Sequence, residues 1–221
     1  MIDLYIGTSN PGKLKEYQNL LKDLTHKFNI LSIMDLEVDE PYETLTENAF
    51  HKATEYSFHV NGLVLAEDSG FFVHSLDRLP GVYSARFYNS ILKYDNLRCL
   101  YISDHDESIK PDPKDIKDLN IKKVLRLLEC NKNRRCHYHT TICIADKGKV
   151  IKTFHGKCDG IVAKSPAGNN GFGYDSIFIP YFEIKNPTPK TFAELKDINL
   201  NITSARGNAT IQVKEFLDKN F

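Results

Sequence analysis

Hydrophobic and polar positions alternate with two different periods at the start of the chain. Ile2 to Ser9 is a largely apolar run that stops at a Pro-Gly turn, which predicts a strand followed by the start of a helix. Apolar side chains then recur every three or four residues, which predicts an amphipathic helix up to Phe28 and a second strand over 28–34. A strand, a turn, a helix and a strand are the opening of an α/β fold.

The rest of the chain continues this alternation. We expect helices over 44–60, 89–102, 119–129 and 204–217, and strands over 63–66, 136–145, 149–161 and 177–179. Thr44 and Glu47 fit a capping box at the start of the first of these helices. Residues 103–119 are charged, broken by proline and without apolar periodicity. We therefore expect an exposed insertion within one domain of 221 residues.

Composition excludes several classes of protein. The 29 basic and 29 acidic side chains cancel, which argues against a nucleic-acid coat protein and a polybasic membrane binder. No apolar run approaches the roughly 20 residues of a membrane span, and the N-terminus lacks the features of a signal peptide. The five cysteines contain no C-x-x-C pair. We therefore expect a cytoplasmic globular protein with reduced thiols.

One candidate ligand segment is Thr8-Ser9-Asn10-Pro11-Gly12-Lys13, where the first strand enters the first helix. Backbone N–H groups at a helix start favour anions, and Lys13 adds a full positive charge. The spacing of a P-loop is absent. Ordinary strand-to-helix turns use the same residue types, so this alternative stays open.

A second candidate is Glu67-Asp68-Ser69-Gly70, directly after a predicted buried strand. Adjacent buried carboxylates are unfavourable unless they are solvated, paired or bound to a cation. Their oxygens are the ligands that Mg²⁺ prefers, together with phosphates and water. Glu40 or Glu43 could supply a further carboxylate from an acidic loop. A solvated turn explains the acidic pair equally well.

A third candidate is the glycine-rich stretch 165–175. Its glycines let the backbone approach a ligand, and Phe172 and Tyr174 offer ring faces to a base. Asp175 could accept a hydrogen bond from a ring N–H group. The alternative is a loop whose aromatic rings fill the core. His137 and His139 share one face of a predicted strand, but the sequence shows no third metal ligand, and we interpret them as structural.

Taken in order, these segments resemble the inosine triphosphate pyrophosphatase family. The resemblance is carried by Thr8–Lys13, Glu47-Asn48-Ala49-x-x-Lys52-Ala53, Glu67–Gly70, Leu79–Arg86, Gly171–Asp175 and Lys190–Leu195. It implies a two-lobed α/β fold around a long mixed β-sheet, with the nucleotide in the cleft between the lobes and a homodimeric assembly. It also implies hydrolysis of ITP, dITP or XTP to the monophosphate and pyrophosphate, with Mg²⁺ as the cofactor and Mn²⁺ as a substitute.

The resemblance further implies roles for individual residues. Asp68 would be both the catalytic carboxylate and a metal ligand, with Glu40 and Glu67 as further metal ligands. The implied substrate-binding residues are Thr8, Ser9, Asn10, Pro11, Gly12, Lys13 and Lys52 at the phosphates, Phe172, Gly173, Tyr174 and Asp175 at the base, and Ser204 and Arg206 closing the pocket. They also include Ser69. The expected partner is a small nucleotide, and we expect no stable binding to nucleic acid and no association with a membrane.

Two positions depart from the family pattern. Leu200 and Ala205 stand where the family keeps a lysine and a histidine. This leaves open a related pyrophosphatase with broader specificity, or a nucleotide-binding protein with weak or no turnover. Preference for a 6-oxopurine is expected from hydrogen bonding, since adenine would leave Asp175 and Arg206 mispaired.

Overall fold

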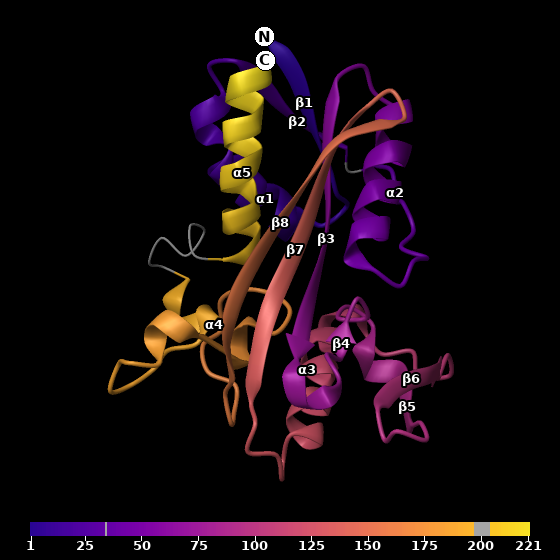
Figure 1. Ribbon diagram of the computed structural model, residues 1–221, viewed down its shortest axis with the longest axis vertical. Coiled ribbons are helices and arrows are strands. Elements are labelled where there is room, and N and C mark those ends of the chain that lie inside the picture. The colour runs from indigo at the N-terminus through magenta and orange to yellow at the C-terminus, as the bar shows by residue number, and fades with distance from the viewer. Residues whose placement is uncertain (34, 197–203) are drawn as a thin grey trace. The chain divides into compact units, whose positions relative to one another are not determined.

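The computed structural model describes residues 1–33, 35–196 and 204–221 (Figure 1). Its elements are β1 (Ile2–Gly7), α1 (Pro11–Leu20), β2 (Phe28–Ile33), α2 (Leu45–Phe58), β3 (Leu63–Val73), β4 (Pro80–Gly81), β5 (Ser90–Tyr94), β6 (Leu100–His105), α3 (Ile116–Leu127), β7 (Arg135–Asp146), β8 (Lys149–Val162), β9 (Phe178–Pro180), α4 (Phe192–Leu195) and α5 (Ala205–Asn220). Within the described residues, no helix combines the length and the apolar character that crossing a membrane requires.

The expected α/β class and long mixed sheet are confirmed. The sheet has the strand order β2-β1-β3-β7-β8-β9, with β4 beside β3. β1 pairs in parallel with β2 and β3, whereas β4 and β9 pair antiparallel with their neighbours. The chain divides into two compact units, which we describe separately. Unit 1 comprises Met1–Ser69, His139–Lys157 and Asn201–Phe221, and unit 2 comprises Gly70–Tyr138 and Cys158–Leu200.

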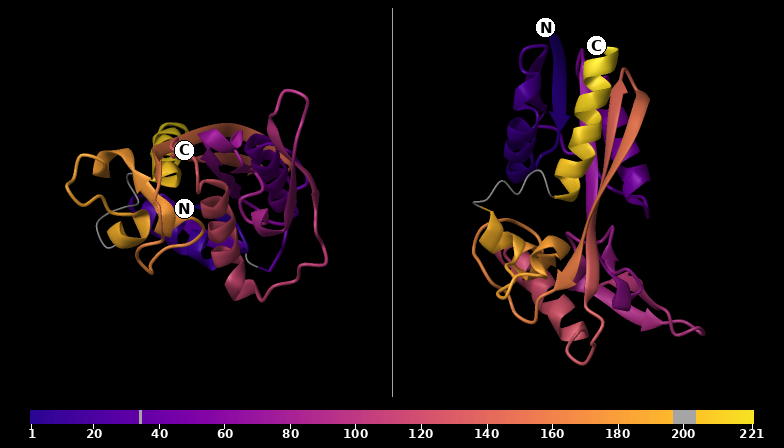
Figure 2. Two further views of the ribbon diagram at one scale, coloured as in Figure 1. Left: turned by 90° about the horizontal axis from the view of Figure 1, so that it is seen from below. Right: turned by 60° about the vertical axis from the view of Figure 1, so that its left-hand side comes forward.

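Unit 1 is a sheet with helices on both faces, and the alternation of side chains along β3 explains this. Leu63 and Leu65 join the core formed with α1 and α5, whereas Val64 and Ala66 join the core formed with α2. Figure 1 shows α1 and α5 on one side of these strands and α2 on the other. The two chain ends lie close together at one end of this unit (Figures 1 and 2).

Short polar side chains begin the helices of unit 1. Asn10, Thr44 and Ser204 are the N-caps of α1, α2 and α5, and each side chain accepts a hydrogen bond from a backbone N–H group of the first turn. The predicted helix up to Phe28 was too long, because α1 ends at Leu20 and a 3₁₀ turn follows. The apolar periodicity persists beyond that point because Leu24 in this turn and Phe28 after it are buried, although Lys22 and Asp23 are exposed.

The predicted helix over 89–102 was wrong, since this segment belongs to the antiparallel hairpin of β5 and β6. The Asp95 carboxylate accepts hydrogen bonds from the N–H groups of Leu97 and Cys99, at 2.8 and 2.9 Å, and closes the turn. Arg98 in this turn has a φ of 59°. This local hydrogen bonding competes with a helix and explains the difference.

Two further boundaries differ from the prediction. β3 continues to Val73, so Glu67 to Gly70 lie inside a strand and do not follow its end. α3 begins at Ile116, within the predicted insertion. Residues 106–115 between β6 and α3 are largely exposed. β3, β7 and β8 each run from one unit into the other along the chain, and a single domain over 1–221 stays a prediction.

Unit 2 is built around stacked aromatic rings. Phe71 on β3 stacks on Tyr174, with ring centroids 4.7 Å apart, and contacts Tyr138 on β7 at 5.0 Å. Phe178 on β9 packs edge-on against Phe192 of α4 at 4.7 Å. Such pairs stabilise a core by about 0.5–1.5 kcal/mol beyond the area that they bury.

The packing of β8 against α5 gives a stability prediction. A Cβ atom added at Gly156 would overlap the Ala205 carbonyl oxygen and the Ala209 amide nitrogen, and backbone atoms of a helix cannot move aside. Gly156→Ala should therefore lower the free energy of unfolding by at least about 2 kcal/mol. Urea unfolding measures it, with exposed Lys157→Ala as the control. Equal stability of the two variants would contradict this packing.

Candidate active site

A buried carboxylate at the middle of β3 collects donors from two helices of unit 1. Arg206 on α5 donates to both oxygens of Glu67, from Nε to Oε2 at 2.8 Å and from a terminal nitrogen to Oε1 at 2.7 Å. Lys13 Nζ on α1 lies 3.1 Å from Oε1, and the Tyr17 hydroxyl donates to Oε2 at 2.5 Å. Ser69 Oγ donates to Oε1 at 3.1 Å. Only 1% of Glu67 is exposed.

These charges overcome the effect of burial on titration. Burial raises the pKa of Glu67, but the positive charges of Arg206 and Lys13 hold it well below its usual range. Burial likewise lowers the pKa of Arg206, but Glu67 and Glu16 raise it well above its usual range. Glu67 and Arg206 therefore stay ionised and fix the sides of α1 and α5 that face β3.

A second group lies around Asp68. Only 4% of Asp68 is exposed, and Asn48 on α2 donates to its Oδ2 at 3.0 Å. Lys52, one helical turn further along α2, donates to Glu40 Oε1 at 2.6 Å and to the carbonyl of Glu67 at 2.9 Å. A buried lysine is thus shared between the acidic loop and β3.

The pKa of Asp68 shifts in the opposite direction to that of Glu67. Burial raises the pKa of Asp68 to about 6 and the charge of Glu40 acts in the same direction, against the opposing charges of Lys52 and Lys13. Mutual destabilisation of two carboxylates is relieved by a divalent cation. Mg²⁺ binds through one or two carboxylates together with phosphate oxygens and waters, and Asp68 with Glu40 fits that requirement.

The predicted phosphate segment connects β1 to α1. Asn10 Oδ1 accepts the N–H groups of Gly12 and Lys13 at 2.9 and 3.2 Å, and Thr8 Oγ1 accepts the N–H group of Asn10 at 3.2 Å. The first amides of α1 are thus already hydrogen-bonded by a side chain of the same turn. The predicted residues that unit 1 holds are Thr8, Ser9, Asn10, Pro11, Gly12, Lys13, Glu40, Lys52, Glu67, Asp68, Ser69, Ser204 and Arg206.

The predicted base-binding segment belongs to unit 2. Asp175 accepts the Phe172 N–H group at 3.0 Å and the Tyr138 hydroxyl at 3.2 Å, which closes the loop. Gly171 and Gly173 have φ values of 94° and 57°, in the left-handed region that favours glycine. A Cβ atom at Gly171 would also overlap the Asp175 carboxylate.

The two aromatic rings of this loop differ in exposure. Tyr174 is 2% exposed, stacks on Phe71 and donates its hydroxyl to the Ser84 carbonyl at 2.9 Å. Burial raises the pKa of Tyr174. Its ring therefore fills the core in this structure, as the alternative interpretation expected. Phe172, in contrast, is 38% exposed.

Sequence reasoning missed Tyr17 and Asn48 as members of these groups. Tyr17 follows Lys13 by four residues and Asn48 precedes Lys52 by four, so each pair shares one helix face. Helical spacing from the predicted lysines could have found both. Of the two departures, Leu200 lies outside the described residues, and Ala205 is buried at the start of α5.

The fold and this site define an α/β protein in which strand-borne carboxylates lie beside helix-borne cations, as expected of an enzyme that binds phosphates together with a metal ion. The model of the Ham1 family matches residues 4–216. The chain belongs to the Ham1 family.

Relatives and solved structures cover the chain nearly completely. A dITP/XTP pyrophosphatase of Exiguobacterium sp. is 36% identical over 93% of this chain and 92% of its own. The dITP/XTP pyrophosphatase of Bacillus subtilis is 31% identical over 99% and 98%. The structure of a HAM1 protein from Coxiella burnetii matches with a TM-score of 0.77 and 27% identity, covering 99% of this chain and 100% of that protein.

Removing the charge of Glu67 should lower the free energy of unfolding. Glu67→Gln leaves Arg206 and Lys13 without their shared carboxylate, and breaking a buried ion pair lowers stability by about 3–5 kcal/mol. Urea unfolding measures this loss. The control is Asp218→Asn, which breaks an exposed ion pair with Lys27 and should leave stability almost unchanged. Similar effects of the two substitutions would refute a central role for Glu67.

Asp68→Asn should instead stabilise the metal-free protein. The pKa of Asp68 is higher in the folded state, about 6 against 3.8, so its contribution to the free energy of unfolding falls as pH rises through this window. At pH 7.5 the ionised carboxylate destabilises the fold by about 2–3 kcal/mol. Urea unfolding in EDTA should show Asp68→Asn to be more stable at pH 7.5 and nearly equal to the wild type at pH 4. A variant less stable at pH 7.5 would contradict the raised pKa.

Proposed function

We propose that the protein hydrolyses ITP, dITP and XTP to the monophosphate and pyrophosphate, which clears deaminated purines from the nucleotide pool. The observation that carries this proposal is the pair of adjacent carboxylates on β3, one neutralised by Arg206 and Lys13 and the other held at a raised pKa. Relatives named dITP/XTP pyrophosphatase, similar over almost their whole length, support the same reaction.

Each charged side chain of unit 1 has a task in this reaction. A triphosphate carries several negative charges, and Lys13 and Lys52 supply positive charge for its oxygens. Asp68 accepts a proton from the water that attacks the α-phosphorus, because its buried carboxylate lies beside the proposed ion and can act as a general base. Glu67 positions Lys13 and Arg206.

We propose Mg²⁺ as the cofactor, with Mn²⁺ as a substitute. Asp68 and Glu40 would hold the ion, which when bound supplies positive charge to the phosphate oxygens and increases the acidity of bound water. Glu67 as a third ligand stays a prediction. Its two oxygens already accept hydrogen bonds or ion pairs from four side chains.

Base recognition is assigned to the loop of unit 2. The exposed ring of Phe172 stacks on the base, which is worth about 1–3 kcal/mol and tolerates any base. Asp175, oriented by Tyr138, accepts the ring N–H group that hypoxanthine and xanthine present and adenine lacks. Tyr174 supports the loop from the core. Roles of Ser204 and Arg206 at the base stay predictions.

We also propose an assembly and a location for the protein. The resemblance favours a homodimer. All five cysteines are free thiols, which fits a reducing compartment such as the cytoplasm.

A nucleotide panel with Mg²⁺ tests the function. Purified protein should release pyrophosphate from ITP, dITP and XTP with kcat/KM at least about a hundredfold above that for ATP. Asp68→Asn should lower kcat by about 10²–10⁴ with the fold retained, whereas exposed Asp23→Asn should keep full activity.

Each contrary outcome of the panel has a distinct meaning. Absence of pyrophosphate from all three substrates would refute the proposal. Equal rates with ATP or pyrimidine nucleotides would favour the broader-specificity alternative. Full activity of Asp68→Asn would remove Asp68 from the mechanism.

A further inference from the structure

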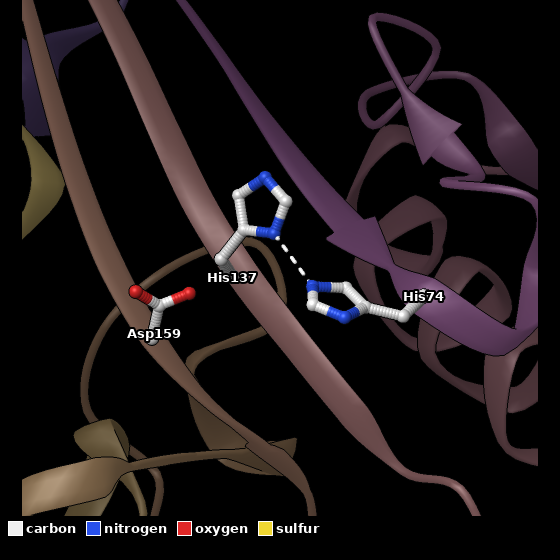
Figure 3. A group of neighbouring side chains, drawn as sticks. All are labelled: His74, His137 and Asp159. Carbon is white, nitrogen blue, oxygen red and sulfur yellow. Dashed lines mark hydrogen bonds between the residues drawn. The ribbon is translucent and has the colours of Figure 1, made fainter.

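Three side chains of types that bind metal ions meet in unit 2, and none of them is assigned to the nucleotide. His74 follows the end of β3, His137 lies in β7 and Asp159 lies in β8. One ligand atom from each residue lies within 4.8 Å of the other two (Figure 3). β3, β7 and β8 are successive neighbours in the sheet, so the group combines residues of β7 and β8 with the residue directly after β3.

The two imidazoles already have the spacing of ligands on one ion. His74 Nε2 lies 3.1 Å from His137 Nδ1, along a hydrogen bond. Two nitrogens at 2.0–2.1 Å from a tetrahedral Zn²⁺ lie about 3.3 Å apart. Replacing the shared proton by a metal ion therefore requires only a small movement of the two rings, and Figure 3 shows Asp159 on the neighbouring strand beside His137.

The surroundings hold one ligand firmly and leave another accessible. His137 is 5% exposed, and its ring stacks on Phe72 with centroids 5.0 Å apart and an angle of 6° between the planes. Asp159 is partly buried and His74 is exposed. An ion can therefore enter from the side of His74, and a water molecule can complete its coordination.

The ligand set identifies the class of ion. Two imidazole nitrogens and one carboxylate suit Zn²⁺ and similar transition ions, whereas Mg²⁺ prefers oxygen ligands. We propose that His74, His137 and Asp159 bind one Zn²⁺ ion per chain, with water as the fourth ligand. The ion connects β3, β7 and β8 within unit 2 and is separate from the Mg²⁺ proposed for Asp68 and Glu40.

The sequence placed His137 and His139 on one face of a strand, and we interpreted both as structural. His139 lies two residues further along β7, but its ring contacts His155 at 5.6 Å in unit 1. The two other members of the group come from 63 residues before His137 and 22 residues after it. The missing third ligand was therefore invisible in the spacing along one strand.

Calorimetric titration of the full chain with ZnCl₂ tests the site. An excess of MgCl₂ occupies the carboxylates of unit 1 during the titration. We expect one Zn²⁺ per chain, a rise of Tm with Zn²⁺, and at least a tenfold weaker affinity for His74→Asn and for Asp159→Asn. His139→Asn is the matched control on the same strand and should keep the wild-type affinity. Far-UV circular dichroism verifies that each variant is folded.

Co²⁺ reports the geometry independently. Four-coordinate Co²⁺ absorbs visible light strongly, so the wild type should give intense bands that His74→Asn loses and His139→Asn retains. Absence of saturable Zn²⁺ binding at micromolar concentration, or equal affinity of wild type and His74→Asn, would overturn the proposal, as would the weak spectrum of six-coordinate Co²⁺. His74→Asn should still hydrolyse ITP with Mg²⁺, so this result and that of the nucleotide panel are independent.

Discussion

The ion network around Glu67 is the interaction on which unit 1 depends. A carboxylate at the middle of a buried strand would lose several kcal/mol of solvation without partners. Arg206 from α5 and Lys13 from α1 supply the compensating charge, and the Tyr17 hydroxyl adds a neutral donor. The same contacts that make the charge tolerable also connect the first and last helices of the chain to β3, in addition to their apolar packing.

The alternation of a β-strand separates two neighbouring acids into different environments. Glu67 continues the face of Leu65, toward α1 and α5, and Asp68 continues the face of Ala66, toward α2. The first face offers a guanidinium and an ammonium group, and the second offers an amide from Asn48. The pKa of Glu67 is therefore held well below its usual range, whereas the pKa of Asp68 is raised to about 6. This division is what a site needs if it must be both stable and reactive.

Local sequence signals predicted the elements that have local causes. The Pro-Gly start of α1, the N-cap at Thr44 and the turn between β7 and β8 all lie where the sequence indicated. The hairpin of β5 and β6 was missed because its turn is determined by the side chain of Asp95 and leaves no signal in the apolar periodicity. The continuation of β3 through Glu67 was missed because its compensating charges come from residues far along the chain. The clustering of His137 with His74 and Asp159 was missed for the same reason, because the pairing of neighbouring strands brings them together and no sequence motif marks them.

The side chain of Asn10 is a hydrogen-bond acceptor for the first backbone N–H groups of α1. Its amide oxygen occupies the N–H groups of Gly12 and Lys13, so an incoming group must replace those hydrogen bonds and gains only the difference. A neutral oxygen gains nothing by this exchange, whereas hydrogen bonds to an anion are roughly twice as strong as those to a neutral acceptor. At the start of α1, where we propose that the phosphates bind, this exchange would favour an anion over a neutral group, and the released amide of Asn10 would become an additional donor.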